Sequence, residues 1–302
     1  MTKRSFEPYI VIVELVLMVM LGWYAYSLLG QPNPISATFD GQRAYKDVQT
    51  QVGFGPRSPE TAGHAQVQEW MRQNLESAGW TVEIQKSESL GHPVENIVAK
   101  RSDEPAQIII GAHYDSRMFA DNDADPANRT KPVPAANDGA SGAAVLLELA
   151  RSLPKDTVPV WLVFFDSEDN GNIEGWDWIL GSREFVNTNS LQPKAVVVID
   201  MIGDTDLNIY RERNSDVQIA DQIWATAKGL GFEKQFINEY KYSMIDDHTP
   251  FLEAGIPAID LIDFDYPYWH TVQDTPDKVS AESLQAVGET LRAWVIQQSG
   301  QP

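Results

Sequence analysis

The sequence contains no cysteine and is short of basic residues. Without cysteine there are no disulfides, thiolate zinc sites or thiol nucleophiles, so any metal must be held by histidine and carboxylate side chains. The 23 Lys and Arg residues are outnumbered by 43 Asp and Glu residues, which gives a net charge of −20. Nucleic-acid binding needs basic side chains that neutralise phosphates, and we therefore expect no nucleic acid among the partners.

One long apolar segment lies near the start of the chain. Residues 9–29 carry a single charge, Glu14, and as a helix they would span about 30 Å, the thickness of a bilayer core. Lys3 and Arg4 precede this segment, which predicts that the amino terminus is cytoplasmic and the rest of the chain extracytoplasmic. A cleaved signal peptide is the alternative interpretation, since Ala25–Ser27 resembles a poor cleavage site.

The chain therefore divides into a cytoplasmic tail (1–8), a single-pass transmembrane signal-anchor (9–29), a linker (30–36) and a catalytic domain (37–302). The linker holds two prolines, which keep it extended and out of a helix. In the remainder, short apolar runs alternate with helical stretches, which predicts an α/β domain with a mostly parallel central sheet. The predicted strands are 96–100, 107–110, 158–165, 195–199 and 258–262, and the predicted helices are 61–79, 142–153 and 280–298.

Side chains that bind metals recur just after the predicted strands or before a helix. In chain order they are His113, Asp115, Asp138, Glu168, Asp169, Asp200, Asp246, His248 and His270. Active sites of parallel sheets form at the carboxyl ends of the strands, so these side chains should meet. Clustered carboxylates repel one another when they lose water, and a cation is needed to keep them ionised together. Alone, Asp138 would suit a helix N-cap and Glu168 a solvated turn, but the joint pattern predicts a zinc site.

These segments resemble a known enzyme family. GAHYDS, ANDGASGAAVLLELAR, FFDSED, IDMIGD and WHTVQDTPDKVS are similar to motifs of the co-catalytic zinc aminopeptidases of metallopeptidase family 28 and of the related glutaminyl-peptide cyclotransferases. The resemblance extends in order from about Gly53 to Trp294. It implies a three-layer α-β-α fold of the zinc aminopeptidase (phosphorylase/hydrolase-like) type, one or two zinc ions, and peptide or protein amino termini as substrates.

The resemblance also implies roles for individual residues. The peptidases hold two zincs at the positions of His113, Asp138, Asp169, Asp200 and His270, with Asp138 bridging. The cyclases hold one zinc at the positions of Asp138, Asp169 and His270, and the positions of Asp200 and Asp246 join a hydrogen-bond network. Glu168 takes the position of the general acid/base. Asp115 corresponds to the carboxylate that orients the zinc-bound histidine, and His248 is expected in a similar supporting position.

Two activities fit this set of residues. In a cyclotransferase, the amino group of an N-terminal glutamine attacks its own side-chain amide, which yields pyroglutamate and ammonia. In an aminopeptidase, water attacks the first peptide bond. The DDHTPFL segment at 246–252, Gly181–Arg183 and Trp269 resemble the cyclases. Against them, animal cyclases have a histidine where this chain has Asp260, and the family has Glu-Glu where this chain has Glu168-Asp169.

We also predict roles for residues that surround the site. Trp176, Trp178 and Trp269 are candidates for the walls of a small substrate pocket. Asp263 and Asp265 precede His270 and could attract the ammonium group of a peptide. A third hypothesis is an inactive relative that binds peptides at the membrane, but its expected signature, loss of Glu168 or of a metal ligand, is absent.

Overall fold

The computed structural model describes residues 38–300, whose central feature is a six-stranded sheet. The strands of this sheet lie in the order β1-β2-β4-β3-β5-β8. β4 pairs with β3, β3 with β5 and β5 with β8 in parallel, while β1 and β2 form an antiparallel edge. The bounds are β1 Thr81–Ser89, β2 His92–Lys100, β3 Ile108–His113, β4 Val160–Phe165, β5 Ala195–Asp200 and β8 Ala258–Ile262.

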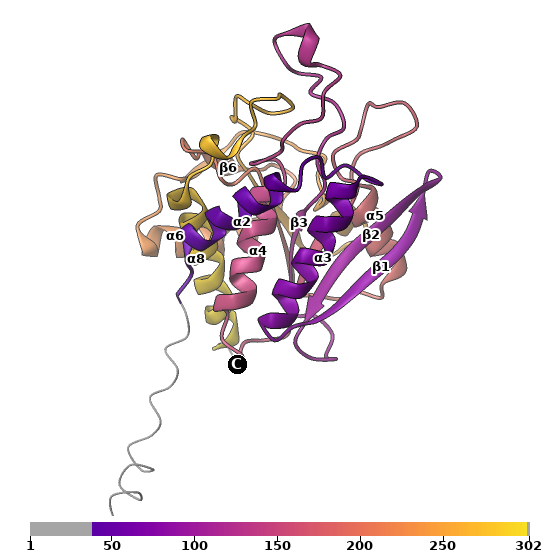
Figure 1. Cartoon of the computed structure of the whole chain (residues 1–302). Helices are drawn as coiled ribbons and strands as arrows, with labels where there is room; N and C mark the ends of the chain where they lie inside the picture. The colour runs from indigo at the N-terminus through magenta and orange to yellow at the C-terminus, as the bar shows by residue number, and fades with distance from the viewer. Residues whose placement is uncertain (1–37, 301–302) are drawn as a thin grey trace, which may run out of the picture. The chain divides into compact units, whose positions relative to one another are not determined.

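Helices cover both faces of the sheet (Figure 1). The helices are α2 Gly41–Gly53, α3 Ala62–Ser77, α4 Ala140–Ser152, α5 Leu180–Thr188, α6 Val217–Leu230, α7 Thr249–Glu253 and α8 Ala281–Ser299. Ile108 and Ile110 of β3 belong to an apolar core that also holds residues of α2, α3, α4, α6 and α8, whereas Ile109 belongs to a second core with Phe185 of α5 and Phe251 of α7. The alternation of strand side chains therefore creates two apolar cores, one per face.

The predicted mixed α/β architecture with a mostly parallel sheet is confirmed. The predicted strand 258–262 matches β8, and the predicted helix 61–79 matches α3, with Thr61 as N-cap and Gly79 just beyond the end at φ +85°. The end of α3 follows from glycine's tolerance of left-handed backbone angles.

Several elements were not predicted. β1 lacks a continuous apolar run because it lies at the edge of the sheet, where alternate side chains face solvent. α2, α5, α6, α7 and the small parallel pair β6 Ile209–Arg211 and β7 Phe236–Tyr240 were also missed. The predicted anchor (9–29) and linker (30–36) lie outside the described residues, and the part from 38 to 300 holds no helix long and apolar enough to cross a bilayer.

Candidate metal and catalytic site

The predicted site residues meet at one edge of the sheet because three parallel strands end there. His113 is the last residue of β3, and Asp200 is the last residue of β5. Glu168 and Asp169 follow β4, and Asp138 lies just before α4. The helix α4 has Gly139 as N-cap without a side-chain cap bond, so Asp138 does not serve as a helix cap.

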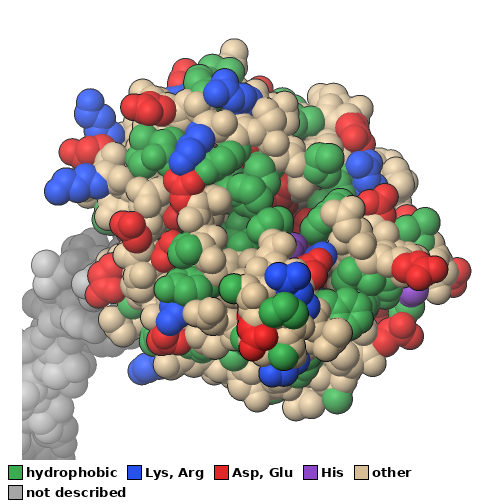
Figure 2. Space-filling model, turned by 90° about the horizontal axis from the view of Figure 1, so that it is seen from above, with side chains coloured by type: hydrophobic (Ala, Val, Ile, Leu, Met, Phe, Trp, Pro, Cys, Tyr) green, Lys and Arg blue, Asp and Glu red, His purple; other side chains and the backbone are tan. Residues whose placement is uncertain are grey.

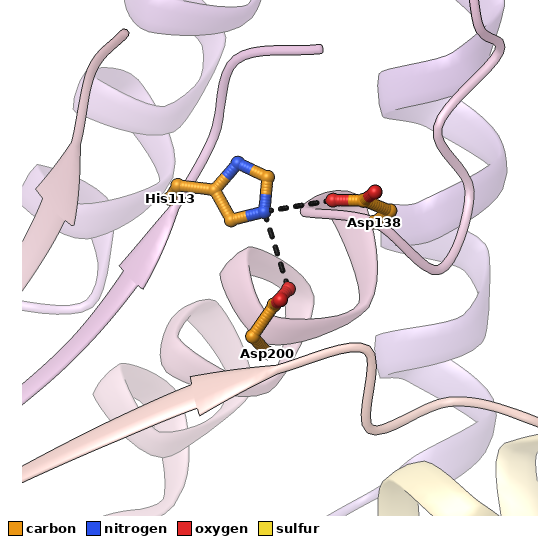
Figure 3. A group of neighbouring side chains, drawn as sticks. All are labelled: His113, Asp138 and Asp200. Carbon is orange, nitrogen blue, oxygen red and sulfur yellow. Dashed lines mark hydrogen bonds and ion pairs between the residues drawn. The ribbon is translucent and has the colours of Figure 1, made fainter. Parts of the chain in front are cut away.

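Two overlapping groups of side chains could each hold a metal ion. In the first, His113 Nε2 lies 3.1 Å from an oxygen of Asp138 and 3.2 Å from Asp200 Oδ1 (Figure 3). In the second, His270 Nε2 lies 2.8 Å from Asp169 Oδ1 and 3.6 Å from Asp138 Oδ2. Asp138 belongs to both groups, so the fold brings together all five predicted metal ligands from five separate segments.

Unpartnered polar atoms distinguish the second group from the first. Within the described part of the chain, Asp138 Oδ2 and Asp169 Oδ2 are buried and form no hydrogen bond, and the buried His270 Nε2 has only ion-pair contacts with Asp169 Oδ1 and Asp138 Oδ2. Leaving such atoms unpaired costs about 1–3 kcal/mol each, more for charged groups. A cation bound among them would satisfy all three, so these donor atoms fit a divalent metal that accepts nitrogen and oxygen ligands.

Without a cation, burial and mutual repulsion oppose ionisation of the clustered carboxylates. Burial raises the pKa of Asp169 to about 6, and the nearby charge of Asp138 adds to this effect. Burial likewise raises the pKa of Asp200 to about 7. Burial opposes ionisation of Asp138, but the hydrogen bond and charge of His113 outweigh it and lower the pKa of Asp138. The shared carboxylate therefore remains the most readily ionised member of these groups.

Two further carboxylates position the candidate ligands. Asp115 Oδ1 lies 3.4 Å from His113 Nδ1 and accepts a hydrogen bond of 3.1 Å from the amide of Glu168, so it contacts both segments. Asp115 therefore lies where it can orient the His113 ring, the role that the resemblance implies for it. Asp274 accepts bonds from the backbone amides of Asn137 and Asp138, and receives a third from the Tyr266 hydroxyl at 2.6 Å.

Glu168 lines a cavity next to both groups. The cavity has about 580 Å³ of empty space, including open solvent at its mouth. Its lining residues are Asp138, Glu168, Asp169, Trp178, Asp200, Met201, Met244, Ile245, Asp246, Ile262, Phe264 and Trp269. The acids lie with mostly apolar walls, and apolar side chains gather around a hollow in this face of the molecule (Figure 2). Burial raises the pKa of Glu168 well above that of a free glutamate.

Two of the three tryptophans predicted to form pocket walls line the cavity, and the third does not. Trp269 and Trp178 line the cavity, as expected from the sequence. Trp176 does not, and its assignment to the substrate pocket is corrected: its indole stacks on His92, with ring centroids 3.7 Å apart. This stacking contact joins the loop after β4 to the β1–β2 hairpin. Sequence alone could not separate Trp176 from Trp178, because both follow Glu168 in the same loop.

His248, Asp263 and Asp265 also lie in different surroundings from those expected. The buried His248 ring lies 3.5 Å from Glu212 and 4.0 Å from Asp260, and no contact with a candidate metal ligand is found within residues 38–300. Asp263 is buried and accepts bonds from the amides of Asn208 and Asp265. Asp265 pairs with Lys241, so neither acid is free to attract a substrate ammonium group.

Three supporting residues were missed in the sequence. Asp274 lies within the quoted WHTVQDT motif and Arg117 directly follows GAHYDS, so their positions beside the ligands were the available signal. Glu212 had no such signal. It accepts bonds from the amides of Asn214, Ser215 and Met244, and thereby fixes the segment that supplies Met244 to the cavity.

Comparison with known proteins places the chain in a family. The model of peptidase family M28 matches residues 96–295. A solved glutaminyl cyclase from Porphyromonas gingivalis is 34% identical, with a TM-score of 0.81 over 87% of this chain and 100% of that one. A Zn-dependent exopeptidase from Parabacteroides distasonis is 29% identical, with a TM-score of 0.81 over 86% and 99%. The glutaminyl-peptide cyclotransferase of Boiga irregularis is 27% identical over 290 residues, which cover 80% of this chain and 77% of that protein. Because the family match spans more than half of the sequence, the chain belongs to peptidase family M28.

Proposed function

We propose that this protein is a zinc-dependent glutaminyl-peptide cyclotransferase that converts an N-terminal glutamine into pyroglutamate and releases ammonia. The observation that carries the proposal is the placement of Glu168 in a mostly apolar-walled cavity beside the buried Asp138–Asp169–His270 group. The similarity to cyclases from Porphyromonas gingivalis and Boiga irregularis supports it.

Zinc would be held by Asp138, Asp169 and His270. These three supply buried atoms without a hydrogen bond, whereas both ring nitrogens of His113 form one, Nδ1 with Asp115 and Nε2 with Asp200. One ion in the second group therefore leaves no unpaired ligand atom there. When bound, zinc supplies Lewis acidity that polarises the side-chain amide carbonyl of the substrate.

Glu168 would move the proton that the reaction must transfer. The α-amino nitrogen attacks the amide carbon, the bond from that carbon to the amide nitrogen breaks, and ammonia leaves. Glu168 accepts a proton from the attacking amine and returns it to the leaving nitrogen. The raised pKa of Glu168, caused by burial, suits a group that must both accept and release a proton near neutral pH. Asp200 and Asp246 line the same cavity and would orient the amine.

The cavity walls favour cyclisation over hydrolysis. Trp178, Phe264 and Trp269 line the cavity, and their apolar rings would limit the water around the reacting atoms. Cyclisation needs no water, because the nucleophile and the carbonyl belong to the same residue, and holding the two close together lowers the barrier.

A zinc aminopeptidase is the second candidate. The observation that favours it is the first group, in which His113 and Asp200 share Asp138 with the second group, because two ions would then bind on either side of Asp138. The similar exopeptidase from Parabacteroides distasonis supports this alternative.

Product identification separates the two candidates. Zinc-loaded protein is incubated with a peptide that begins with Gln and with the same peptide lengthened by an N-terminal alanine. A cyclotransferase yields pyroglutamyl peptide and ammonia from the first peptide only, as measured by mass spectrometry. Release of free glutamine or alanine without pyroglutamate would overturn the proposal, and zinc stoichiometry on the same sample counts the bound ions.

We also propose that residues 9–29 anchor the enzyme in a membrane with the catalytic domain on the extracytoplasmic side. The apolar run and the basic residues before it support the proposal. The full-length chain should remain in the membrane fraction after a high-salt and alkaline wash, while a chain starting at Ala37 should be soluble. Recovery of uncleaved full-length protein in the soluble fraction would contradict it.

A further inference from the structure

Arg117 is buried beside the candidate ligands but is neither a ligand nor a cavity residue. Its side chain donates to the backbone carbonyls of Asp169 at 3.0 Å and Gly171 at 3.1 Å. It also forms a two-point ion pair with the carboxylate of Asp121, at 2.8 Å and 2.5 Å. One guanidinium group therefore connects the turn that carries Asp169 to the loop after β3.

Asp121 in turn lies behind His270. Its Oδ1 is 3.6 Å from His270 Nδ1, whereas the Nε2 of the same ring faces Asp169 and Asp138. The next amide, that of Asn122, donates to the carbonyl of His270 at 3.2 Å. A carboxylate on the far side of an imidazole favours a proton on the nearer nitrogen and leaves the other nitrogen free to bind a metal.

Trp178 lies beside both Arg117 and His270. Its ring lies 5.2 Å from the Arg117 guanidinium and 6.1 Å from the His270 ring, to which it is nearly parallel. Asp121 itself is 44% exposed at its side chain and would be free to turn toward solvent without Arg117. The pair thus combines a buried, fully engaged cation with a carboxylate that this cation holds in place.

We propose that Arg117 and Asp121 form a positioning pair that holds Asp169 and His270 at metal-binding spacing and directs Nε2 of His270 toward the ion. The inference rests on the proposed function only in requiring that zinc binds at the second group. Arg117 fixes the ligand-bearing turn through its carbonyl bonds, and the charge of Asp121, 3.6 Å from Nδ1 of His270, favours the tautomer that carries its proton on that nitrogen. Neither residue touches the reacting atoms.

The test is the zinc dissociation constant, measured by competition with a chromogenic chelator. Asp121→Asn and Arg117→Gln should each weaken zinc binding by about 10–100-fold, the usual effect of removing a group that orients a ligand. The double variant should lose no more than the more affected single variant, because the two residues act as one unit. Asp125→Asn, an exposed acid of the same loop, should leave the constant unchanged.

A purely structural role would give a different pattern. Asparagine has nearly the shape of aspartate, so the metal-free Asp121→Asn variant should melt at the same temperature as metal-free wild type. A lower melting temperature together with unchanged zinc affinity would overturn the inference, as would an equal loss of affinity in Asp125→Asn. If Arg117→Gln does not fold, Asp121→Asn decides the question alone. Wild type that binds zinc but releases amino acids would refute the cyclotransferase proposal and leave this inference standing.

Discussion

At the scale of single residues, burial changes the pKa of the acidic side chains in the site. Glu168 lies buried in the wall of the cavity, and burial raises the pKa of its carboxyl group well above that of a carboxyl group in water. A carboxylate that loses water becomes a better proton acceptor, and this is the property that the proposed reaction needs from Glu168.

The first prediction concerns Glu168→Gln. This change keeps the size of the side chain but removes proton transfer, so we expect kcat to fall by about 10²–10⁴-fold. Zinc content should remain equal to that of wild type, because Glu168 belongs to neither candidate metal group. Steady-state kinetics with a Gln-peptide and metal analysis measure the two effects. Glu174→Gln, an exposed residue of the same loop, is the control; full activity in Glu168→Gln would refute the assigned role.

The second prediction concerns Gly139→Ala. A Cβ atom at Gly139 would lie 2.6 Å from a ring carbon of His113, so the imidazole must move. A displacement of about 1 Å in an active site commonly costs about 10²-fold in rate, and we expect a loss of kcat/KM of that order. Gly229→Ala, where a Cβ would meet nothing within 4 Å, is the matched control. Equal activity of the two variants would show that the position of His113 does not matter.

At the scale of secondary-structure elements, a fully buried strand could be predicted from the sequence, whereas a half-exposed strand could not. β8, with all five residues buried, was predicted with its observed bounds, because a continuous apolar run between turns has few alternatives. β1 has an alternating pattern of half-exposed side chains without such a run, and its strand state follows from pairing with β2 along its whole length. Of the helices, α3 could be predicted from the helical spacing of its apolar residues and from Gly79 at its end, whereas the five-residue α7 is too short to show a period.

The third prediction concerns the loop between β6 and α6. Burial would raise the pKa of Glu212, but the nearby His248 and the hydrogen bonds from the amides of Asn214 and Met244 and from Ser215 outweigh it and lower the pKa to about 2. A lowered folded-state pKa stabilises the protein above the unfolded pKa of about 4.3, and this stability is lost as the pH falls toward about 2.

The measurement compares metal-free wild type with Glu212→Gln by urea unfolding at several pH values. The free energy of unfolding of wild type should exceed that of the variant most at neutral pH, by about 2–3 kcal/mol. The difference should shrink as the pH falls below about 4.3. Glu233→Gln, on an exposed residue, controls for the loss of one negative charge. A difference that stays constant with pH would contradict the role given to Glu212.

At the scale of the whole molecule, the acidic site opposes folding unless a cation is bound. Asp138, Asp169, Asp200 and Glu168 are all buried at one edge of the sheet, in a chain with a net charge of −20. Their mutual repulsion is one reason why a metal that binds only the folded state should also stabilise it.

The fourth prediction is a rise in thermal stability on zinc binding. At a free zinc concentration of 100 times the dissociation constant, the gain is about 2.7 kcal/mol, which raises Tm by roughly 5–10 °C for a domain of this size. Calorimetry with and without chelator measures the shift. His270→Ala should abolish most of it, and a shift of the same size in this variant would mean that zinc binds elsewhere.

The sequence by itself determined the class of fold, the edge of the sheet that bears the site, and the side chains that meet there. These follow from local rules: buried parallel strands are apolar runs, and their carboxyl ends share one edge. Only the tertiary structure decided which tryptophan lines the cavity, that His248 contacts Glu212 rather than a ligand, and that Arg117 joins Asp169 to Asp121. Such contacts join residues far apart in the chain, and their distances and orientations depend on how all layers pack, which no local pattern contains.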